Sequence, residues 1–248
     1  MYDFSERIAV VTGAGKGIGR VIAERLLNDG VAGIALLDYD EKLVQATTAE
    51  LDPTGERAMA VTCDVSKEDA VQEAFAKIYA RFGRVDILVN NAGIIRDAMF
   101  HKMTPAQMHQ VIDVNLFGTY NCIYQVVPGM REQGYGKIVN ISSTSSYGNV
   151  GQANYSASKA AMEGMTKTLA KELGRKNITV NCVLPGMIDT EMMRSIPADM
   201  LEARVKSTPM QRMGEPREVA ALVAFLASDE SSYVSGTCII CSGGCIIH

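Results

Sequence analysis

Short apolar runs rich in β-branched residues alternate with longer amphipathic segments along the chain, and this alternation limits the fold more than any other feature. The apolar runs predict strands at 8–12, 34–37, 58–62, 85–89, 137–141, 178–183 and near 236–241. The amphipathic segments predict helices at 17–28, 67–82, 104 to about 130, 154–174 and 215–227. Apolar strands joined by such helices form parallel sheets that are covered on both faces. We therefore expect a single-domain, doubly wound α/β fold over residues 1–248 with a seven-stranded parallel sheet.

Composition narrows the classes of partner. The 248 residues are 47% hydrophobic and 21% charged, which is ordinary for a globular domain, and the formal net charge is −4. Because lysines and arginines do not cluster on one segment, we expect neither nucleic acid nor an anionic membrane as a partner. The polar first residues and the absence of an apolar run of roughly 20 residues predict a cytoplasmic protein.

The six cysteines are expected to be reduced in that compartment and to pack as small apolar side chains. Cys238, Cys241 and Cys245 lie near His248, but they fall on the last expected strand and turn and lack a paired second cluster. We therefore expect no metal site.

A glycine-rich turn joins the first strand to the first helix. Its residues Thr12 to Gly19 read Thr-Gly-Ala-Gly-Lys-Gly-Ile-Gly, so the glycines that follow the strand have the spacing Gly-x3-Gly-x-Gly. Backbone amides at a helix N-terminus favour a phosphate group, and glycines let it approach the backbone. This turn predicts a dinucleotide site, although an unliganded strand-to-helix turn is the alternative. The residues expected there are Gly13, Gly15, Lys16, Gly17, Ile18 and Gly19.

Acidic residues end the next two strands. Asp38 lies 19 residues after Gly19, where a carboxylate accepts hydrogen bonds from a ribose 2′-hydroxyl and repels a 2′-phosphate. This favours NAD over NADP, although Asp38 could instead cap the next helix and Lys16 could meet a 2′-phosphate. Asp64, with Val65, is placed to touch the adenine or only to serve a turn. After the fourth strand, the small residues Asn91, Ala92 and Gly93 leave room for a flat cofactor.

Tyr155 and Lys159 lie four residues apart on an expected helix and hence on one face. A tyrosine has a pKa near ~10 and is a poor acid or base at neutral pH, but a nearby ammonium favours the phenolate. We therefore expect Lys159 to lower the pKa of Tyr155 and the pair to act in proton transfer. A half-buried aromatic residue beside a solvated lysine is the alternative. A cluster of hydroxyl residues, 142–146, follows the preceding strand.

Taken together, these motifs resemble those of the classical short-chain dehydrogenase/reductase family over essentially the whole chain, with Asn115, Pro185 and Gly186 also in family order. The resemblance implies a Rossmann-like fold and an oxidoreductase that moves a hydride between NAD(P) and a carbonyl or secondary alcohol. It implies that Tyr155 exchanges a proton with the substrate oxygen and that Lys159 holds the cofactor ribose. A serine would orient the carbonyl, and Asn115 would support a proton-relay water. The residues expected to cover the nicotinamide are Pro185, Gly186, Ile188 and Thr190.

Two ways of counting along the sequence give different positions for the serine that would orient the substrate carbonyl. Counting back 13 residues from Tyr155, as the family spacing does, gives Ser142, whereas counting forward from the strand gives Ser143. A strand end is fixed by its hydrogen-bonded ladder, whereas a loop can lose a residue, so we favour Ser143.

Within the family, segments 95–97, 148–149, 151–155 and 225–228 are most similar to 3-oxoacyl-(acyl carrier protein) reductases. Two positions depart from them: Asp38 is unexpected in an NADP enzyme, and Ser242 stands where an aspartate usually precedes the paired glycines. The resemblance also implies a homo-oligomer, commonly a tetramer.

The segment 187–213, rich in Met, Pro and charged residues, predicts a substrate loop or lid. We expect an apolar carbonyl or alcohol substrate, such as an acyl thioester. The expected wall residues are Met99, Phe100, Met103, Tyr147, Val150, Met187, Met192, Met193 and Met200. An NAD-dependent hydroxysteroid or other secondary-alcohol dehydrogenase is the first alternative, and a non-catalytic nucleotide-binding scaffold is the second.

Overall fold

The computed structural model describes residues 2–194 and 198–246 and contains a seven-stranded sheet in the order β3-β2-β1-β4-β5-β6-β7. Every neighbouring pair of strands is parallel. The expected Rossmann-like α/β fold is confirmed. The strands are β1 Ile8–Thr12, β2 Gly33–Asp38, β3 Ala58–Thr62, β4 Ile87–Asn90, β5 Gly136–Ile141, β6 Ile178–Pro185 and β7 Cys238–Cys241.

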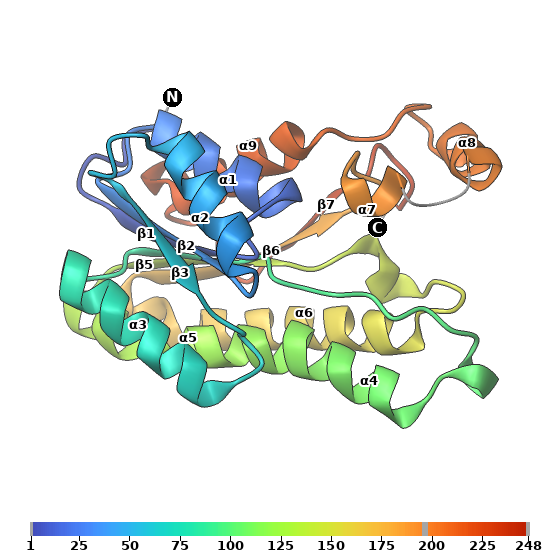
Figure 1. The fold of residues 1–248 in the computed structure, drawn as a ribbon, viewed down its shortest axis with the longest axis horizontal. Coiled ribbons are helices and arrows are strands. Elements are labelled where there is room, and N and C mark those ends of the chain that lie inside the picture. The colour runs from blue at the N-terminus through green and yellow to red at the C-terminus, as the bar shows by residue number, and fades with distance from the viewer. Residues whose placement is uncertain (1, 195–197, 247–248) are drawn as a thin grey trace.

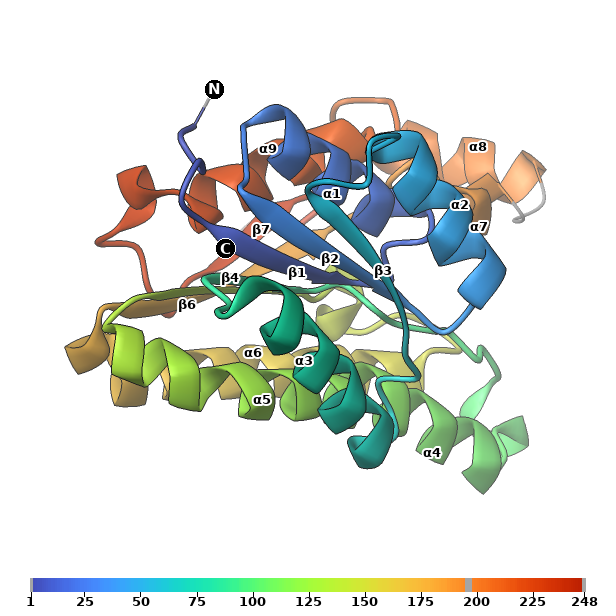
Figure 2. The ribbon, with the colours of Figure 1, turned by 60° about the vertical axis from the view of Figure 1, so that its left-hand side comes forward.

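Helices cover both faces of the sheet (Figures 1 and 2). One layer holds α1 (Gly17–Asn28), α2 (Glu41–Leu51) and α9 (Pro216–Ala227). The opposite layer holds α3 (Glu68–Phe82), α4 (Pro105–Ile112), α5 (Gly118–Gln133) and α6 (Ala153–Leu173). This arrangement leaves the carboxyl ends of the strands open, which is where such sheets bind ligands.

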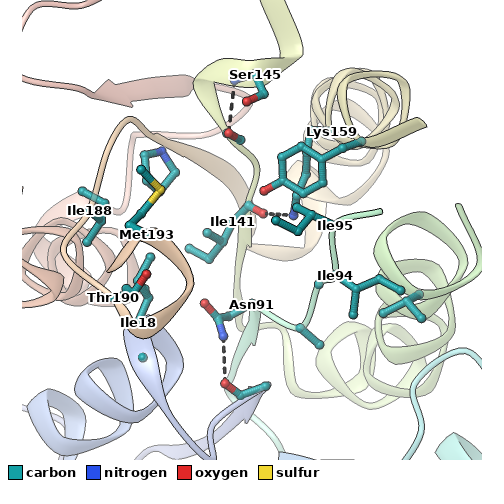
Figure 3. A pocket seen from close by; sticks show the side chains of 18 of the residues that line it. Ile18, Asn91, Ile94, Ile95, Ile141, Ser145, Lys159, Ile188, Thr190 and Met193 are labelled. Carbon is teal, nitrogen blue, oxygen red and sulfur yellow. Dashed lines mark hydrogen bonds between the residues drawn. The ribbon is translucent and has the colours of Figure 1, made fainter. Parts of the chain in front are cut away.

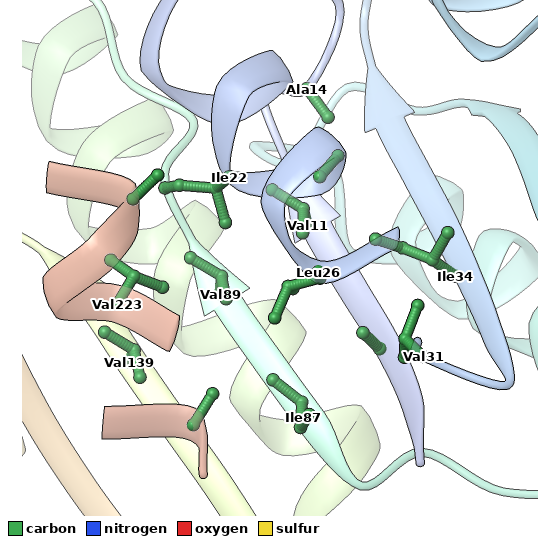
Figure 4. Packing of buried hydrophobic residues seen from close by; sticks show 14 of the residues in the cluster. Val11, Ala14, Ile22, Leu26, Val31, Ile34, Ile87, Val89, Val139 and Val223 are labelled. Atoms are coloured by element: carbon green, nitrogen blue, oxygen red, sulfur yellow. The ribbon is translucent and has the colours of Figure 1, made fainter. Parts of the chain in front are cut away.

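Alternate residues of each strand supply two buried clusters. Val11 and Val89 face α1 and α9, where they pack with Leu26 and Val223 (Figure 4). Val10 and other residues one position along the strands face the α3–α5–α6 layer instead. Because a sheet buried on both faces needs apolar residues at successive positions, β1 and β4 are buried throughout.

The long helical segment expected from 104 to about 130 is interrupted. It consists of α4, a π-helical turn at Asp113–Phe117, and α5. A capping box begins α4, since Thr104 accepts from the Gln107 amide and the Gln107 side chain accepts from the Thr104 amide. Ser66 does not cap α3, although it lies just before that helix, because it donates its hydroxyl back to Asp64.

The segment 187–213 carries two short helices, α7 (Glu191–Arg194) and α8 (Ala198–Ser207), beyond the strand ends (Figure 1). In the part of the chain described here, no helix is both long and apolar enough to cross a bilayer.

Candidate active site

A cleft of about 1020 Å³ runs across the carboxyl ends of the strands, and residues that follow β1 to β6 line it. Figure 3 shows one part of it, with Asn91 and Ile141 at its centre. Ile18, Ile188, Thr190 and Met193 lie on one side, and Ile94, Ile95 and Lys159 lie on the other. The predicted residues that line it are Gly13, Lys16, Gly17, Ile18, Asp38, Asp64, Val65, Asn91, Ala92, Gly93, Ser143, Tyr155, Lys159, Pro185, Gly186, Ile188 and Thr190.

The glycine turn begins α1 at one end of this cleft. A Cβ on Gly19 would lie 2.2 Å from the Gly13 carbonyl oxygen, so only glycine lets the helix pack on the turn. Asn91 fastens the turn to β4 by donating to the carbonyl oxygens of Thr12 and Gly13, at 3.0 Å each. Gly17 lines the cleft with a φ of 59°. The N-cap residue Lys16 makes no side-chain hydrogen bond to the start of α1, which leaves the first amides of this helix for a ligand's anionic group.

Asp38 is 8% exposed at the end of β2. Its Oδ2 accepts from the Gly15 amide at 3.0 Å, and the Gly15 carbonyl oxygen accepts from the Thr47 hydroxyl at 2.6 Å. Asp38 does not cap α2, because Asp40 does so through the Leu43 amide. The Asp38 carboxylate thus holds the glycine turn and also lines the cleft.

The other charged residues at this end already have partners. Lys16 forms an exposed ion pair of 3.1 Å with Glu191 on α7. This pair joins the glycine turn to the segment 187–213. Asp64 accepts from both the amide and the hydroxyl of Ser66, while Val65 is buried beside it.

Residues 185–190 lie beside the glycine turn and form the wall on that side of the cleft. The Gly186 amide donates to the Cys241 carbonyl oxygen at 2.9 Å, and Ile188 forms a β-bridge with Gly214. A Cβ on Gly17 would lie 3.9 Å from Cγ2 of Thr190. The four residues expected to cover a nicotinamide therefore lie along one side of the cleft.

The two candidate serines point in different directions. Ser142 is buried, and its hydroxyl donates to the Lys159 carbonyl oxygen at 3.0 Å and contacts Glu163 at 3.2 Å. Ser143 precedes the 3₁₀ turn Thr144–Tyr147, and its side chain hydrogen-bonds to that of Tyr155. The structure therefore brings Ser143, not Ser142, to the Tyr155 hydroxyl.

Lys159 is buried, and its Nζ donates to the Ile141 carbonyl oxygen at 2.7 Å. Burial lowers the pKa of Lys159 from 10.5 to about 8. The same Nζ lies 5.6 Å from the centre of the Tyr155 ring.

Burial raises the pKa of Tyr155, while the hydrogen bond with Ser143 acts in the opposite direction and Asp97 adds to the increase. The prediction that Lys159 brings this pKa below its usual value is therefore wrong for the protein alone. The physical reason is desolvation, which affects both groups and disfavours each charged form.

Asn115 lies within the π-helical turn and is fully buried. Its Oδ1 accepts from the Ile94 amide at 2.8 Å, and its Nδ2 donates to the Ile94 carbonyl oxygen and to Ser158 at 3.1 Å each. Asn115 thus fixes the segment after β4 against the helix that carries Tyr155.

The expected substrate wall is only partly correct. Met187 and Met193 line the cleft, whereas Met99, Phe100, Met103, Tyr147 and Val150 do not. Phe100 and Val150 are 77% and 83% exposed. Loop side chains have no periodicity that fixes their direction, so the sequence could not place them. The side chains of Met192 and Met200 lie outside the described ones.

Sequence reasoning missed other lining residues, including Tyr39, Gln110 and Arg204. Tyr39 directly follows Asp38 and is 77% exposed, so its position beside an expected ribose site was a usable signal. Arg204 lies on α8, and no motif marks it.

Comparisons with known proteins agree with this geometry. Residues 13–245 match the family described as Enoyl-(Acyl carrier protein) reductase. The chain is 46% identical over 240 residues to an acetoacetyl-CoA reductase of Shinella zoogloeoides, covering 96% of this chain and 98% of the relative. It is 42% identical over 242 residues to a 3-oxoacyl-[acyl-carrier-protein] reductase of Thermotoga maritima, covering 97% and 98%.

A solved structure is similar to this chain over nearly its whole length. The crystal structure of a 3-oxoacyl-[acyl-carrier protein] reductase from Brucella melitensis has a TM-score of 0.93 and 38% identity, covering 99% of this chain and 93% of that one. The chain therefore belongs to the short-chain dehydrogenase/reductase family and is an oxidoreductase that uses NAD or NADP.

Proposed function

We propose that this enzyme reduces the C3 ketone of a 3-oxoacyl thioester to an alcohol, with Tyr155 as the proton donor and NADH as the preferred cofactor. The observation that carries the proposal is the meeting of Ser143, Tyr155 and Lys159 in the cleft that also contains the glycine turn.

The residues divide the work by position. When bound, a nicotinamide cofactor supplies or accepts the hydride. The Tyr155 hydroxyl gives its proton to the substrate oxygen, and a protonated phenol suits this direction because burial raises the pKa of Tyr155. The Ser143 hydroxyl is placed to donate a hydrogen bond to the same oxygen and so to stabilise developing negative charge. Lys159, whose Nζ lies 5.6 Å from the centre of the Tyr155 ring, would hold the cofactor ribose.

The glycine turn and its neighbours fit the rest of the cofactor. The uncapped amides at the start of α1 would receive the pyrophosphate, and residues 185–190 would cover the nicotinamide. Asp64, Val65 and the segment 91–93 line the space between. Asn115 keeps the loop after β4 in place and, as the family resemblance implies, would support a proton-relay water.

Asp38 supports NADH. Its buried carboxylate lies at the end of β2, where a ribose 2′-hydroxyl would donate to it and a 2′-phosphate would be repelled. Lys16, the cation that could compensate, already pairs with Glu191.

The lining of the cleft supports an acyl thioester. Ile94, Ile95, Ile141, Met187 and Met193 provide an apolar surface for a short acyl chain. Two further lining residues, Arg96 and Arg204, are cationic and suit the phosphates of a pantetheine-type carrier. Similarity to the acetoacetyl-CoA reductase named above supports the same substrate class, because acetoacetyl-CoA is a 3-oxoacyl thioester.

The test is a rate comparison of NADH and NADPH against acetoacetyl-CoA, a 3-ketosteroid and a simple aliphatic ketone. We expect the highest kcat/KM with the thioester and NADH. A higher kcat/KM for the steroid or the simple ketone would overturn the substrate class and favour the secondary-alcohol dehydrogenase alternative, for which Asp38 also argues.

We further propose a cytoplasmic homotetramer. All six cysteines are free, as a reducing compartment favours. Phe117, Tyr120 and Tyr124 form an exposed aromatic stripe on one side of α5, and Ala157, Ala161 and Gly164 leave an exposed small-residue surface on α6. Exposed apolar surface of this kind is typical of a subunit contact.

A further inference from the structure

Two cysteines of neighbouring strands face each other directly. In the parallel pair β6–β7, Cys182 is the register partner of Cys238. Neighbouring strands lie about 4.8 Å apart, and paired residues project to the same face. Since β7 is the edge strand, Cys238 is half-buried, whereas Cys182 is fully buried.

The two thiols also interact. The interaction between their side chains raises the pKa of Cys182 and lowers the pKa of Cys238, and the Cys182 thiol also lies 4.0 Å from the Val183 carbonyl oxygen, to which it donates. Burial of Cys238 and the charge of Glu163 oppose this decrease, while Lys167 adds to it. The buried thiol therefore keeps its proton and stabilises a thiolate on the more exposed partner.

The other cysteines with shifted pKa values behave in the opposite way. Burial raises the pKa of Cys63 to about 11 and also raises that of Cys122. Cys241 lies on the same strand as Cys238 and is also half-buried, yet burial raises its pKa. Exposure alone therefore does not explain why the pKa of Cys238 is lowered and that of Cys241 is raised, whereas the Cys182 thiol beside Cys238 does.

We propose that Cys182 and Cys238 form a dithiol that hydroperoxides oxidise reversibly to a disulfide, a modification site separate from the proposed hydride-transfer chemistry. The Cys238 thiolate attacks the peroxide, the O–O bond breaks, and Cys238 becomes a sulfenic acid while hydroxide, or an alkoxide from an organic peroxide, leaves. The Cys182 sulfur then displaces the sulfenic hydroxyl. The S–S bond forms, the Cys182 proton leaves with that hydroxyl as water, and each sulfur has lost one electron overall.

The position of the pair favours this second step. Disulfides require Cα atoms about 4.4 to 6.8 Å apart, a range that includes the spacing of neighbouring strands. The partner thiol is already in hydrogen-bonding contact, so the sulfenic acid would meet Cys182 before a second peroxide arrives.

The test uses the full-length enzyme, hydrogen peroxide and peptide mass spectrometry. We expect a linked Cys182–Cys238 peptide lighter by two hydrogen atoms, which dithiothreitol restores to the thiols. Cys182→Ala should instead leave a Cys238 sulfenic acid that dimedone traps, and Cys238→Ser should give neither product. Cys241→Ser is the matched control and should form the linked peptide as the unmodified chain does.

Alkylation by iodoacetamide gives an independent measurement. Cys238 should react faster than Cys241, and Cys182→Ala should slow it by about fivefold, the effect of losing one hydrogen bond to the sulfur. Thermal melting shows whether each variant is folded, and Cys182→Val, which also removes the thiol donor, replaces Cys182→Ala if the alanine variant is not. Equal rates for Cys238 and Cys241, no effect of the Cys182 substitution, or a failure to find the linked peptide would overturn the proposal. Turnover of any substrate does not enter either readout.

Discussion

Replacing Lys159 with methionine should make the protein more stable while abolishing its activity. Lys159 is 3% exposed, and burial lowers its pKa from 10.5 to about 8. Since one pKa unit corresponds to about 1.4 kcal/mol, keeping this ammonium charged in the folded protein costs roughly 3 kcal/mol. Methionine has a similar length and no charge, but it leaves the Ile141 carbonyl oxygen without its donor, which costs about 1 kcal/mol. The expected net gain is about 2 kcal/mol.

The stability difference between Lys159→Met and the unmodified protein should depend on pH in a definite direction. Below pH 8, Lys159 is protonated in both the folded and the unfolded chain, so the full cost of burial is present. Between pH 8 and 10.5, the folded chain loses this proton while the unfolded chain keeps it, and the stability of the unmodified protein rises with pH relative to the variant. The advantage of Lys159→Met should therefore be largest at pH 7 and shrink across that window.

Urea denaturation at pH 7, 8, 9 and 10 measures this difference, with Lys167→Met on the same helix as the control. Lys167 is exposed, so its substitution should change the free energy of unfolding by less than about 0.5 kcal/mol. A Lys159→Met variant that is less stable at neutral pH, or whose advantage does not change with pH, would refute the argument from burial.

Three further predictions concern the cleft and the assembly. Ser143→Ala should lower kcat by about 100-fold because a hydrogen-bond donor to the substrate oxygen is lost, whereas Ser142→Ala should mainly reduce stability by about 1 kcal/mol; equal losses of kcat would contradict the orientation of these serines. Asp38→Asn keeps an acceptor for the Gly15 amide but removes the charge, so the ratio of kcat/KM for NADPH to that for NADH should rise about tenfold, which corresponds to ~1.4 kcal/mol; an unchanged ratio argues against Asp38 as the selector. Tyr124→Glu places a charge in the aromatic stripe of α5 and should lower the mass measured by light scattering, and a single-chain mass for the unmodified protein would rule out the tetramer.

The alternation of apolar and amphipathic segments was enough to predict the sheet, because the five central strands are buried on both faces and each crossover needs a helix. The break at Asp113–Phe117 was not predictable in the same way. Apolar periodicity continues through a π-helical turn, and only the contacts of Asn115 with Ile94 and Ser158 show why the helix deviates there.

The sequence likewise predicts some features of the candidate site, whereas others depend on how distant parts of the chain pack together. The position of Tyr155 and Lys159 on one helical face follows from their spacing, but the direction of the Tyr155 pKa shift depends on how much protein surrounds the phenol, which a sequence does not give. The Lys16–Glu191 pair joins residues 175 positions apart and depends on where α7 lies. The exposed positions of Phe100 and Val150 likewise reflect loop conformation.

The most direct test of the proposed proton transfer is the rate of thioester reduction by Tyr155→Phe, measured together with its cofactor affinity. The chain contains no tryptophan, so the fluorescence of the reduced nicotinamide itself should report binding. We predict that kcat falls by about 1000-fold, within the range of a lost general acid, while the dissociation constant of NADH changes less than about twofold, because the phenyl ring still fills its place. A variant that keeps a substantial fraction of the original kcat would contradict the assignment of Tyr155 as the proton donor.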